Sequence, residues 1–155
     1  MQIEEPLCGD VSMDTARLKL QVGTLENKLG HDDLAIKNLH AGIEIFRGKG
    51  IELHPELETA LANLGESYSR LKKFGPAVAN QKSATQISGH MWGTESLQYA
   101  NQANRLGVIF HRAGNNSVAV KILETAKQIR KQELGSQSIE FANSCLNLGL
   151  SLIHI

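Results

Sequence analysis

An internal repeat with a constant period of 42 residues limits the folds open to this sequence. A bulky apolar residue followed by glycine occurs four times, and each glycine lies 42 residues after the one before it: Val22-Gly23, Leu64-Gly65, Leu106-Gly107 and Leu148-Gly149. The same interval separates three alanines and three isoleucines: Ala35, Ala77, Ala119, Ile45, Ile87 and Ile129. Such a period is typical of repeat proteins, in which one small unit stacks on the next. The 155-residue chain therefore holds about three and a half copies of one unit.

Each unit is predicted to form two helices joined by a tight turn. In the second unit, apolar residues follow helical steps of three and four: Leu57, Leu61, Leu64, Tyr68 and Leu71. A break follows, and a second helical stripe begins at Ala77. Residues acceptable at a helix N-cap stand at one register before the second helix of each unit: Asp33, Gly75 and Ser117. The predicted fold class is all-α.

The recurrent glycine has a predicted role in packing. A glycine inside a helix costs about 0.5–1 kcal/mol relative to alanine, so a repeated one suggests a steric demand. We expect it to lie where the two helices of a unit cross closely.

Composition and charge narrow the classes of function. There are 16 Lys+Arg and 16 Asp+Glu residues, whereas a general nucleic-acid binder normally carries a basic excess. No stretch approaches the roughly 20 apolar residues of a membrane span, and the N-terminus lacks the apolar run of a secretory signal. The two cysteines, Cys8 and Cys145, are too few for a disulfide framework. We expect a cytoplasmic protein whose partners include neither nucleic acid nor membrane.

No motif in the sequence predicts catalysis. The six histidines form no zinc-binding pair on one helix, and no phosphate-binding loop, nucleophile elbow or dinucleotide fingerprint occurs. Cys145 falls on the apolar stripe of the last helix, where we expect a buried filler and not a nucleophile. Trp92 is expected to pack against the neighbouring unit. The prediction is a protein that is not an enzyme and has no metal site or cofactor.

The second and third units resemble the tetratricopeptide repeat (TPR). That motif has a large residue and a glycine, an aromatic residue three positions later, and small residues in the second helix. The matching residues are Leu64-Gly65, Tyr68, Ala77 and Ala84, and Leu106-Gly107, Phe110, Ala119 and Ala126. The longer period, with His54-Pro55 before a helix and Leu134-Gly135 in a loop, is similar to the repeats of kinesin light chains and nephrocystin-type proteins.

The resemblance covers residues 14–155 and implies the arrangement of the whole chain. It implies a right-handed α-α superhelix, that is, a TPR solenoid, with its first helices lining a concave groove. The repeats would span residues 15–54, 55–96, 97–138 and, in part, 139–155. Residues 1–13 would form a flexible N-terminal segment.

A set of groove-lining positions follows from the resemblance, and we take these residues as the candidate peptide-binding site. They are Arg17, Gln21, Asn63, Glu66, Arg70, Asn101, Asn104, Arg105, Arg112, Asn143 and Asn147. Asparagine can donate to and accept from an extended backbone, and arginine pairs with carboxylates. The expected ligand is therefore an extended or helical, acidic peptide of another protein, and the expected function is that of an adaptor. The resemblance also implies ligand contacts for Asn63 and Asn147, the best single candidates.

One specialised form of peptide binding is not expected. TPR domains that bind chaperone tails hold a C-terminal carboxylate with a set of lysines, asparagines and arginine. Of the corresponding residues here, which are Leu20, Thr24, Asn63, Asn101 and Arg105, only Asn63 and Arg105 match.

A second function stays open at this stage. The fourth unit has a first helix without a second, which would leave apolar residues uncovered: Leu146, Leu150, Leu152, Ile153 and Ile155. The alternative to an adaptor is a structural or assembly segment of a longer solenoid. Such a segment would self-associate through this C-terminal helix to give a homo-oligomer.

Overall fold

The computed structural model describes residues 8–153, and for residues 8–11 the backbone alone. Within that range the chain forms seven helices. They are α1 (Cys8–Leu29), α2 (Asp32–Gly48), α3 (Pro55–Arg70), α4 (Phe74–Trp92), α5 (Leu97–Arg112), α6 (Asn116–Leu134) and α7 (Ile139–Ile153). The described residues contain no strand, so the all-α prediction is confirmed. Helix α1 begins at Cys8, inside the stretch 1–13 that was expected to precede the repeats.

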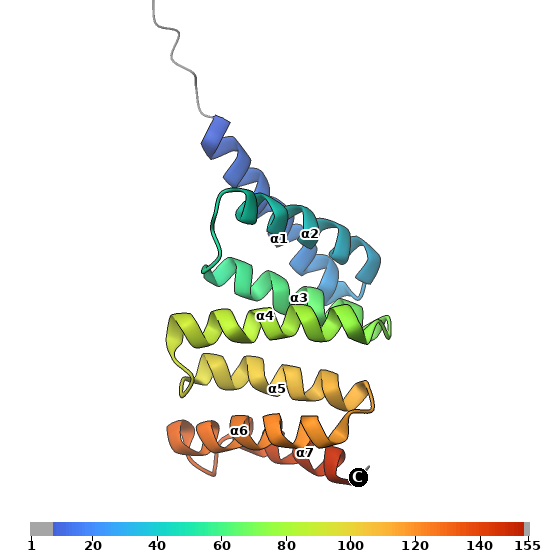
Figure 1. Cartoon of the computed structure of the whole chain (residues 1–155), viewed down its shortest axis with the longest axis vertical. Coiled ribbons are helices and arrows are strands. Elements are labelled where there is room, and N and C mark those ends of the chain that lie inside the picture. Colours follow the sequence, from blue (N-terminus) through green and yellow to red (C-terminus); the bar gives the residue numbers. More distant parts are fainter. Residues whose placement is uncertain (1–7, 154–155) are drawn as a thin grey trace, which may run out of the picture.

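The helices pack in pairs that follow one another along the long axis of the molecule (Figure 1). α1 packs on α2, α3 on α4 and α5 on α6, and each pair also contacts the next one. We call α1, α3, α5 and α7 the helices A, and α2, α4 and α6 the helices B. α7 packs against α6, and the described residues provide no helix B for it.

The repeated glycines lie at the crossings within the pairs. A Cβ atom added to Gly107 would lie 2.6 Å from Cγ of Leu123, and one added to Gly23 would lie 2.7 Å from Cγ of Leu39. At Gly65 the nearest atom would be the carbonyl oxygen of Ala77, at 3.1 Å. The glycine thus permits an approach that a side chain would prevent, as the repeat predicted.

The turn between helix A and helix B depends on one residue with positive φ. The φ angles are 78° at Gly30, 59° at Lys72 and 81° at Gly114, at one register of the repeat. The next residue then donates its N–H to a carbonyl five positions back, for example Lys73 N to Tyr68 O at 2.9 Å. Lys72 therefore holds a left-handed conformation that the other two units give to glycine.

The predicted N-caps of the helices B are wrong. Asp33, Gly75 and Ser117 lie inside the helices, which begin at Asp32, Phe74 and Asn116. The residues at the cap positions are His31, Lys73 and Asn115, and none of their side chains makes a capping hydrogen bond. The left-handed turn brings the chain directly into the next helix, so these starts carry no side-chain capping signal. Helices α3 and α5 do have side-chain caps, because Glu56 N donates to His54 Nδ1 and Tyr99 N donates to Ser96 Oγ.

The core of the described residues extends along the stack in two clusters, a larger one from α1 to α4 and a smaller one from α5 to α7. Its largest fully buried side chains include Phe46, Leu39, Ile43, Leu61 and Leu64. The alanines of the repeat, such as Ala77 and Ala119, are also fully buried, where a larger side chain would separate the helices.

The outer side of α7 is uncovered. Leu146, Leu150, Leu152 and Ile153 are exposed, as predicted, while Ile155 lies outside the described residues. A Cβ on Gly149 would meet no atom within 4 Å, in contrast to the three earlier glycines. Cys145 is exposed, so the expectation of a buried filler is wrong: its stripe is apolar, but no described helix covers that side of α7.

Candidate functional site

The predicted groove residues all lie on the helices A, and we call the exposed side of these four helices the helix-A face. Successive helices A meet at three joints: α1 with α3, α3 with α5, and α5 with α7. Most of the predicted side chains bridge a joint instead of pointing freely to solvent. Their partners therefore decide which of them can still meet a ligand.

At the first joint, Asn63 takes part in a buried amide network. Its Nδ2 donates to Thr24 Oγ1 at 3.1 Å, and the side chain is almost fully buried. Asn27 on α1 completes the network, because its Nδ2 donates to Asn63 O at 2.9 Å and to Ser67 Oγ at 2.8 Å. The amide of Asn63 thus ties α3 to α1, which differs from the ligand contact that the resemblance implies.

Arg70 is held by an acid that the sequence analysis missed. Its guanidinium donates to both carboxylate oxygens of Asp32, with contacts of 2.6–3.1 Å, and to Asn27 O at 2.8 Å. Burial by itself would raise the pKa of Asp32, but hydrogen bonds from Arg70 and Ser67 have the larger combined effect. The pKa of Asp32 therefore lies below its ordinary value. The hydrogen bond to Asp32 also raises the pKa of Arg70. Asp32 occurs in one unit alone, since the equivalent residues are Phe74 and Asn116.

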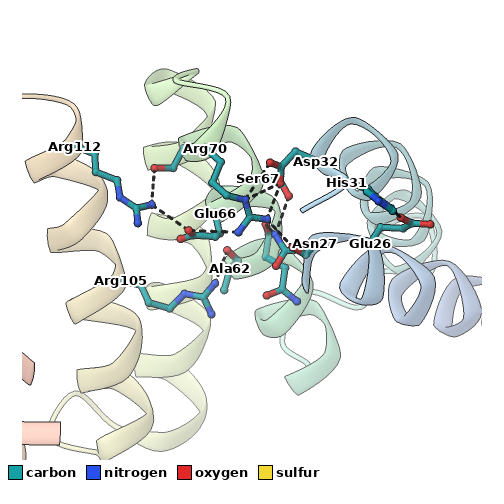
Figure 2. A network of polar contacts seen from close by, with 12 residues as sticks. Glu26, Asn27, His31, Asp32, Ala62, Glu66, Ser67, Arg70, Arg105 and Arg112 are labelled. Atoms are coloured by element: carbon teal, nitrogen blue, oxygen red, sulfur yellow. Dashed lines mark hydrogen bonds and ion pairs between the residues drawn. The ribbon is translucent and has the colours of Figure 1, made fainter. Parts of the chain in front are cut away.

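The second joint carries a cluster of arginines around Glu66 (Figure 2). Arg112 Nη1 donates to Glu66 Oε1 at 3.1 Å and to Ser69 Oγ at 3.3 Å, and Arg70 Nη1 lies 3.6 Å from Glu66 Oε1. Arg105 points inward and donates from Nη2 to Ala62 O at 3.0 Å. Burial lowers the pKa of Arg105, although an arginine remains charged at neutral pH.

Asparagines and one arginine span the third joint. Asn147 Nδ2 donates to Asn104 Oδ1 at 3.3 Å. Arg130 on α6 donates to Asn101 Oδ1 at 2.8 Å and to Ser144 Oγ at 2.6 Å, and its burial lowers its pKa. Asn143 is exposed on α7.

Two hollows open on the helix-A face, one at each end. The first hollow has a volume of about 500 Å³ and lies between α1 and the start of α3. It is lined by Arg17, Leu20, Gln21, Thr24, Leu25, Pro55, Glu56 and Thr59. The third-joint hollow has a volume of about 230 Å³ and lies between α5, α6 and α7. It is lined by Val108, His111, Arg112, Leu123, Asn147, Leu150 and Ser151.

The first hollow brings together predicted and unpredicted residues. Arg17 and Gln21 were predicted, and Arg17 Nε lies 3.5 Å from Glu56 Oε2 at its edge. Its apolar wall was missed, because Leu25 and Pro55 stand outside the groove positions of the repeat. The side chain of Leu25 is 59% exposed, and the apolar pattern of the sequence does not predict this exposure.

The described residues were also compared with the expectations for metal binding, for membrane spans and for Trp92. No group of three or more His, Cys, Asp or Glu side chains among them could hold a metal ion. None of the described helices combines the length and the apolar character that crossing a membrane requires. Trp92 is half-exposed, and its Nε1 donates to Glu58 Oε2 at 3.3 Å. This bond lies within its own unit, so the expected packing of Trp92 against the neighbouring unit stays a prediction.

Comparison with known proteins identifies the fold. No protein-family model matches the chain, and no curated protein matches it. BtubC (BKLC) from P. vanneervenii is similar to it in structure, with a TM-score of 0.83 and 22% identity over 90% of this chain and 56% of that one. A protein of Podospora anserina, described as a kinesin light chain with nearly identical TPR-like repeats, has a TM-score of 0.75 and 17% identity over 88% of this chain and 64% of that one. The chain spans less than two thirds of each. It has the TPR-like superhelical repeat fold, as the sequence predicted.

Proposed function

We propose that the chain is a protein-interaction scaffold whose helix-A face binds a peptide segment of another protein. The first hollow is the observation that carries this proposal, because two of the predicted groove residues, Arg17 and Gln21, line it. Thr24 and Thr59 add hydroxyl groups to the same lining. Its volume of about 500 Å³ falls within the range of roughly 300–1,000 Å³ that is usual for ligand pockets. We also propose that the protein acts in the cytoplasm, without a catalytic reaction or cofactor of its own.

The lining of the hollow suggests the chemistry of the peptide. Leu20, Leu25 and Pro55 give an apolar wall, and Gln21 and Thr24 offer hydrogen-bonding groups beside it. An apolar anchor side chain of the peptide would lie against that wall, with its backbone amides facing the polar groups.

The charge of the face supports an acidic segment, though by a small margin. Arg17, Arg70, Arg105 and Arg112 contribute four positive charges to the described face. The carboxylates next to them, Asp32, Glu56 and Glu66, contribute three negative charges. One positive charge is left over, so we propose that acidic residues flank the anchor and that salt weakens binding modestly.

A peptide selection with two matched variants tests the proposal. Random peptides would be selected on the full chain, and the affinity of the selected sequences measured by fluorescence anisotropy. Leu25→Asp places a charge on the wall of the first hollow and should weaken binding at least tenfold. Leu34→Asp changes a leucine of α2 that is similarly exposed and lies outside the hollow, and should leave the affinity unchanged. Equal affinity of both variants, at unchanged helicity, would contradict the groove assignment.

A second candidate function rests on the uncovered side of α7. A contiguous set of large, exposed apolar residues is unusual on the surface of a monomer. Helix α7 carries such a set, namely Leu146, Leu150 and Ile153. Self-association through α7 would cover them. Sedimentation of the full chain at increasing concentration tests this: Leu146→Asp should abolish any dimer, and a wild-type monomer at every concentration would rule the candidate out.

A further inference from the structure

Trp92 is a large apolar residue that has no part in the helix-A face. It is the single tryptophan of the chain and the last residue of α4, and it is 47% exposed. It lines a hollow of about 470 Å³ together with the α4–α5 loop and a residue near the end of α6. This Trp92 hollow consists of Trp92, Gly93, Thr94, Glu95, Ser96 and Glu133. The C-terminal ends of α4 and α6 lie at the same edge of the stack (Figure 1).

The indole ring is held at its N–H edge. Trp92 Nε1 donates to Oε2 of the buried Glu58 at 3.3 Å, and Oε1 of that carboxylate accepts from Gln102 Nε2 at 2.8 Å. A tryptophan N–H group needs such a partner, and here the bond is made while much of the residue stays exposed. Trp92 therefore presents a positioned aromatic surface to solvent.

The loop beside the ring is shaped by its own hydrogen bonds. Ser96 Oγ donates to Gly93 O at 2.7 Å and accepts from Tyr99 N at 3.1 Å. Gly93 has a φ angle of 89°, in the region that favours glycine. The loop thus has a defined shape before any ligand binds, as is usual for binding sites.

Two carboxylates line the hollow without a cation of their own. Glu95 and Glu133 are exposed and come from two different units of the repeat. No hydrogen bond or ion pair joins either side chain to another described residue. The other residues that line the hollow are neutral, so two negative charges stand beside the Trp92 ring.

The repeat fold does not require this combination. The positions of Trp92, Glu95 and Glu133 are filled 42 residues earlier by Gly50, Leu53 and Met91. In the third unit the first two positions are Leu134 and Gln137. The aromatic ring and the two acids meet at one place in the stack, which favours a role other than packing.

We propose that the Trp92 hollow binds the side chain of an arginine in a segment of another protein. A guanidinium is planar, so it can stack on the indole face, where the ring attracts its positive charge. Its N–H groups would donate to the carboxylates of Glu95 and Glu133.

Other ligands match the hollow less well. A metal ion lacks ligands, because no group of three or more His, Cys, Asp or Glu side chains among the described residues could hold one. An acidic side chain would meet two like charges, and an apolar one would leave both carboxylates without a partner. The ammonium group of a lysine is more strongly hydrated than a guanidinium and has no planar face for stacking.

Three matched peptides test the ligand chemistry. The single indole N–H signal of Trp92 would be followed by NMR in the isotope-labelled full chain, at constant ionic strength. The probes are blocked Gly-Xaa-Gly peptides in which Xaa is arginine, lysine or citrulline, the uncharged analogue of arginine. The arginine peptide should give a saturable shift, and the citrulline peptide should bind about fivefold more weakly or worse. No shift, equal affinity for arginine and citrulline, or tighter binding of lysine would overturn the inference.

Single carboxylate substitutions separate the hollow from the general charge of the surface. Glu95→Gln, which copies the third unit, and Glu133→Gln should each weaken binding of the arginine peptide about threefold and leave the citrulline peptide unaffected. Glu124→Gln removes an exposed carboxylate of α6 outside the hollow and should change neither affinity. If Glu124→Gln weakens binding as much as Glu95→Gln does, long-range attraction explains the effect and the site is refuted.

Trp92→Leu tests the contribution of the ring. The variant copies Leu134 of the third unit and should weaken binding of the arginine peptide about threefold or more, measured from the amide signals of Thr94 and Ser96. Unchanged binding in a folded Trp92→Leu chain would overturn the inference. If this variant does not fold, the carboxylate variants decide the question.

The origin of the arginine is tested separately, because a second copy of the chain also carries arginines. A wild-type chain that stays monomeric in sedimentation and binds the arginine peptide supports a segment of another protein. A dimer that Glu95→Gln dissociates would assign the site to self-association and overturn that part of the proposal. The inference does not depend on the helix-A face: Leu25→Asp lies in the first hollow and should leave binding of the arginine peptide unchanged, so either proposal can fail alone.

Discussion

Substituting alanine at two glycines of the same register separates packing from helix propensity. Both Gly107 and Gly149 lie inside a helix A, so each substitution gains the same propensity, about 1 kcal/mol. At Gly107 the new Cβ would lie 2.6 Å from Leu123 Cγ and 2.7 Å from its Cδ2, where carbon atoms normally stay about 3.5–4.0 Å apart. At Gly149 it would meet no atom within 4 Å. Overpacking a core costs about 1–3 kcal/mol, and that cost should appear in Gly107→Ala alone.

The difference in the free energy of unfolding between the two variants gives the cost of a side chain at the helix crossing. We expect Gly149→Ala to be more stable than the wild type by up to about 1 kcal/mol, and Gly107→Ala to be about 1–3 kcal/mol less stable than Gly149→Ala. Guanidinium chloride unfolding of the full chain, followed by far-UV circular dichroism, gives both values. If the two variants unfold at the same denaturant concentration, Leu123 adjusts at no cost and the packing role of the glycine is refuted.

Two further predictions concern a turn and the ion pair between Asp32 and Arg70. Lys72→Gly should stabilise the chain by about 0.5–1 kcal/mol, because φ is 59° at this residue. Lys49→Gly is the control and should not stabilise the chain, because φ is −89° there. An equal shift of Tm in both variants, measured by thermal unfolding, would contradict this prediction. The pKa of Asp32 is lower in the folded chain than its ordinary value of 3.8, so its pair with Arg70 stabilises above that pH and the stabilisation is lost as the pH falls through the folded pKa. The stability advantage of the wild type over Asp32→Asn, measured by urea unfolding between pH 7 and pH 3, should therefore shrink near the acid end, and a constant difference would be the contrary result.

The repeat predicted the fold because the same packing problem is solved in each unit. Gly23, Gly65 and Gly107 show at sequence level where helices cross, and the alanines follow them at a fixed distance. The starts of the helices B could not be placed in the same way. The main chain makes those turns, with a left-handed residue such as Gly30 or Lys72, and leaves no capping side chain to recognise.

The repeat register predicts which residues share the helix-A face, but not which of them a ligand could reach. Asn63 and Arg105 do lie on the helix-A face, yet both donate across a joint to the preceding helix A. Whether a side chain can still meet a ligand depends on the residue it contacts on the adjacent helix A, about 40 residues away in the sequence. That neighbour differs from unit to unit: Thr24 faces Asn63, while a main-chain carbonyl faces Arg105.

The pairing of helices along the stack has a consequence for how the molecule acquires its structure. Within the described helices, every contact between elements joins a helix to the next one or to the one after it. Such a chain has a low contact order, so few long loops must close before native contacts form, and folding is fast for its length. Any adjacent pair, α3 with α4 for instance, can act as a nucleus from which structure propagates toward both ends.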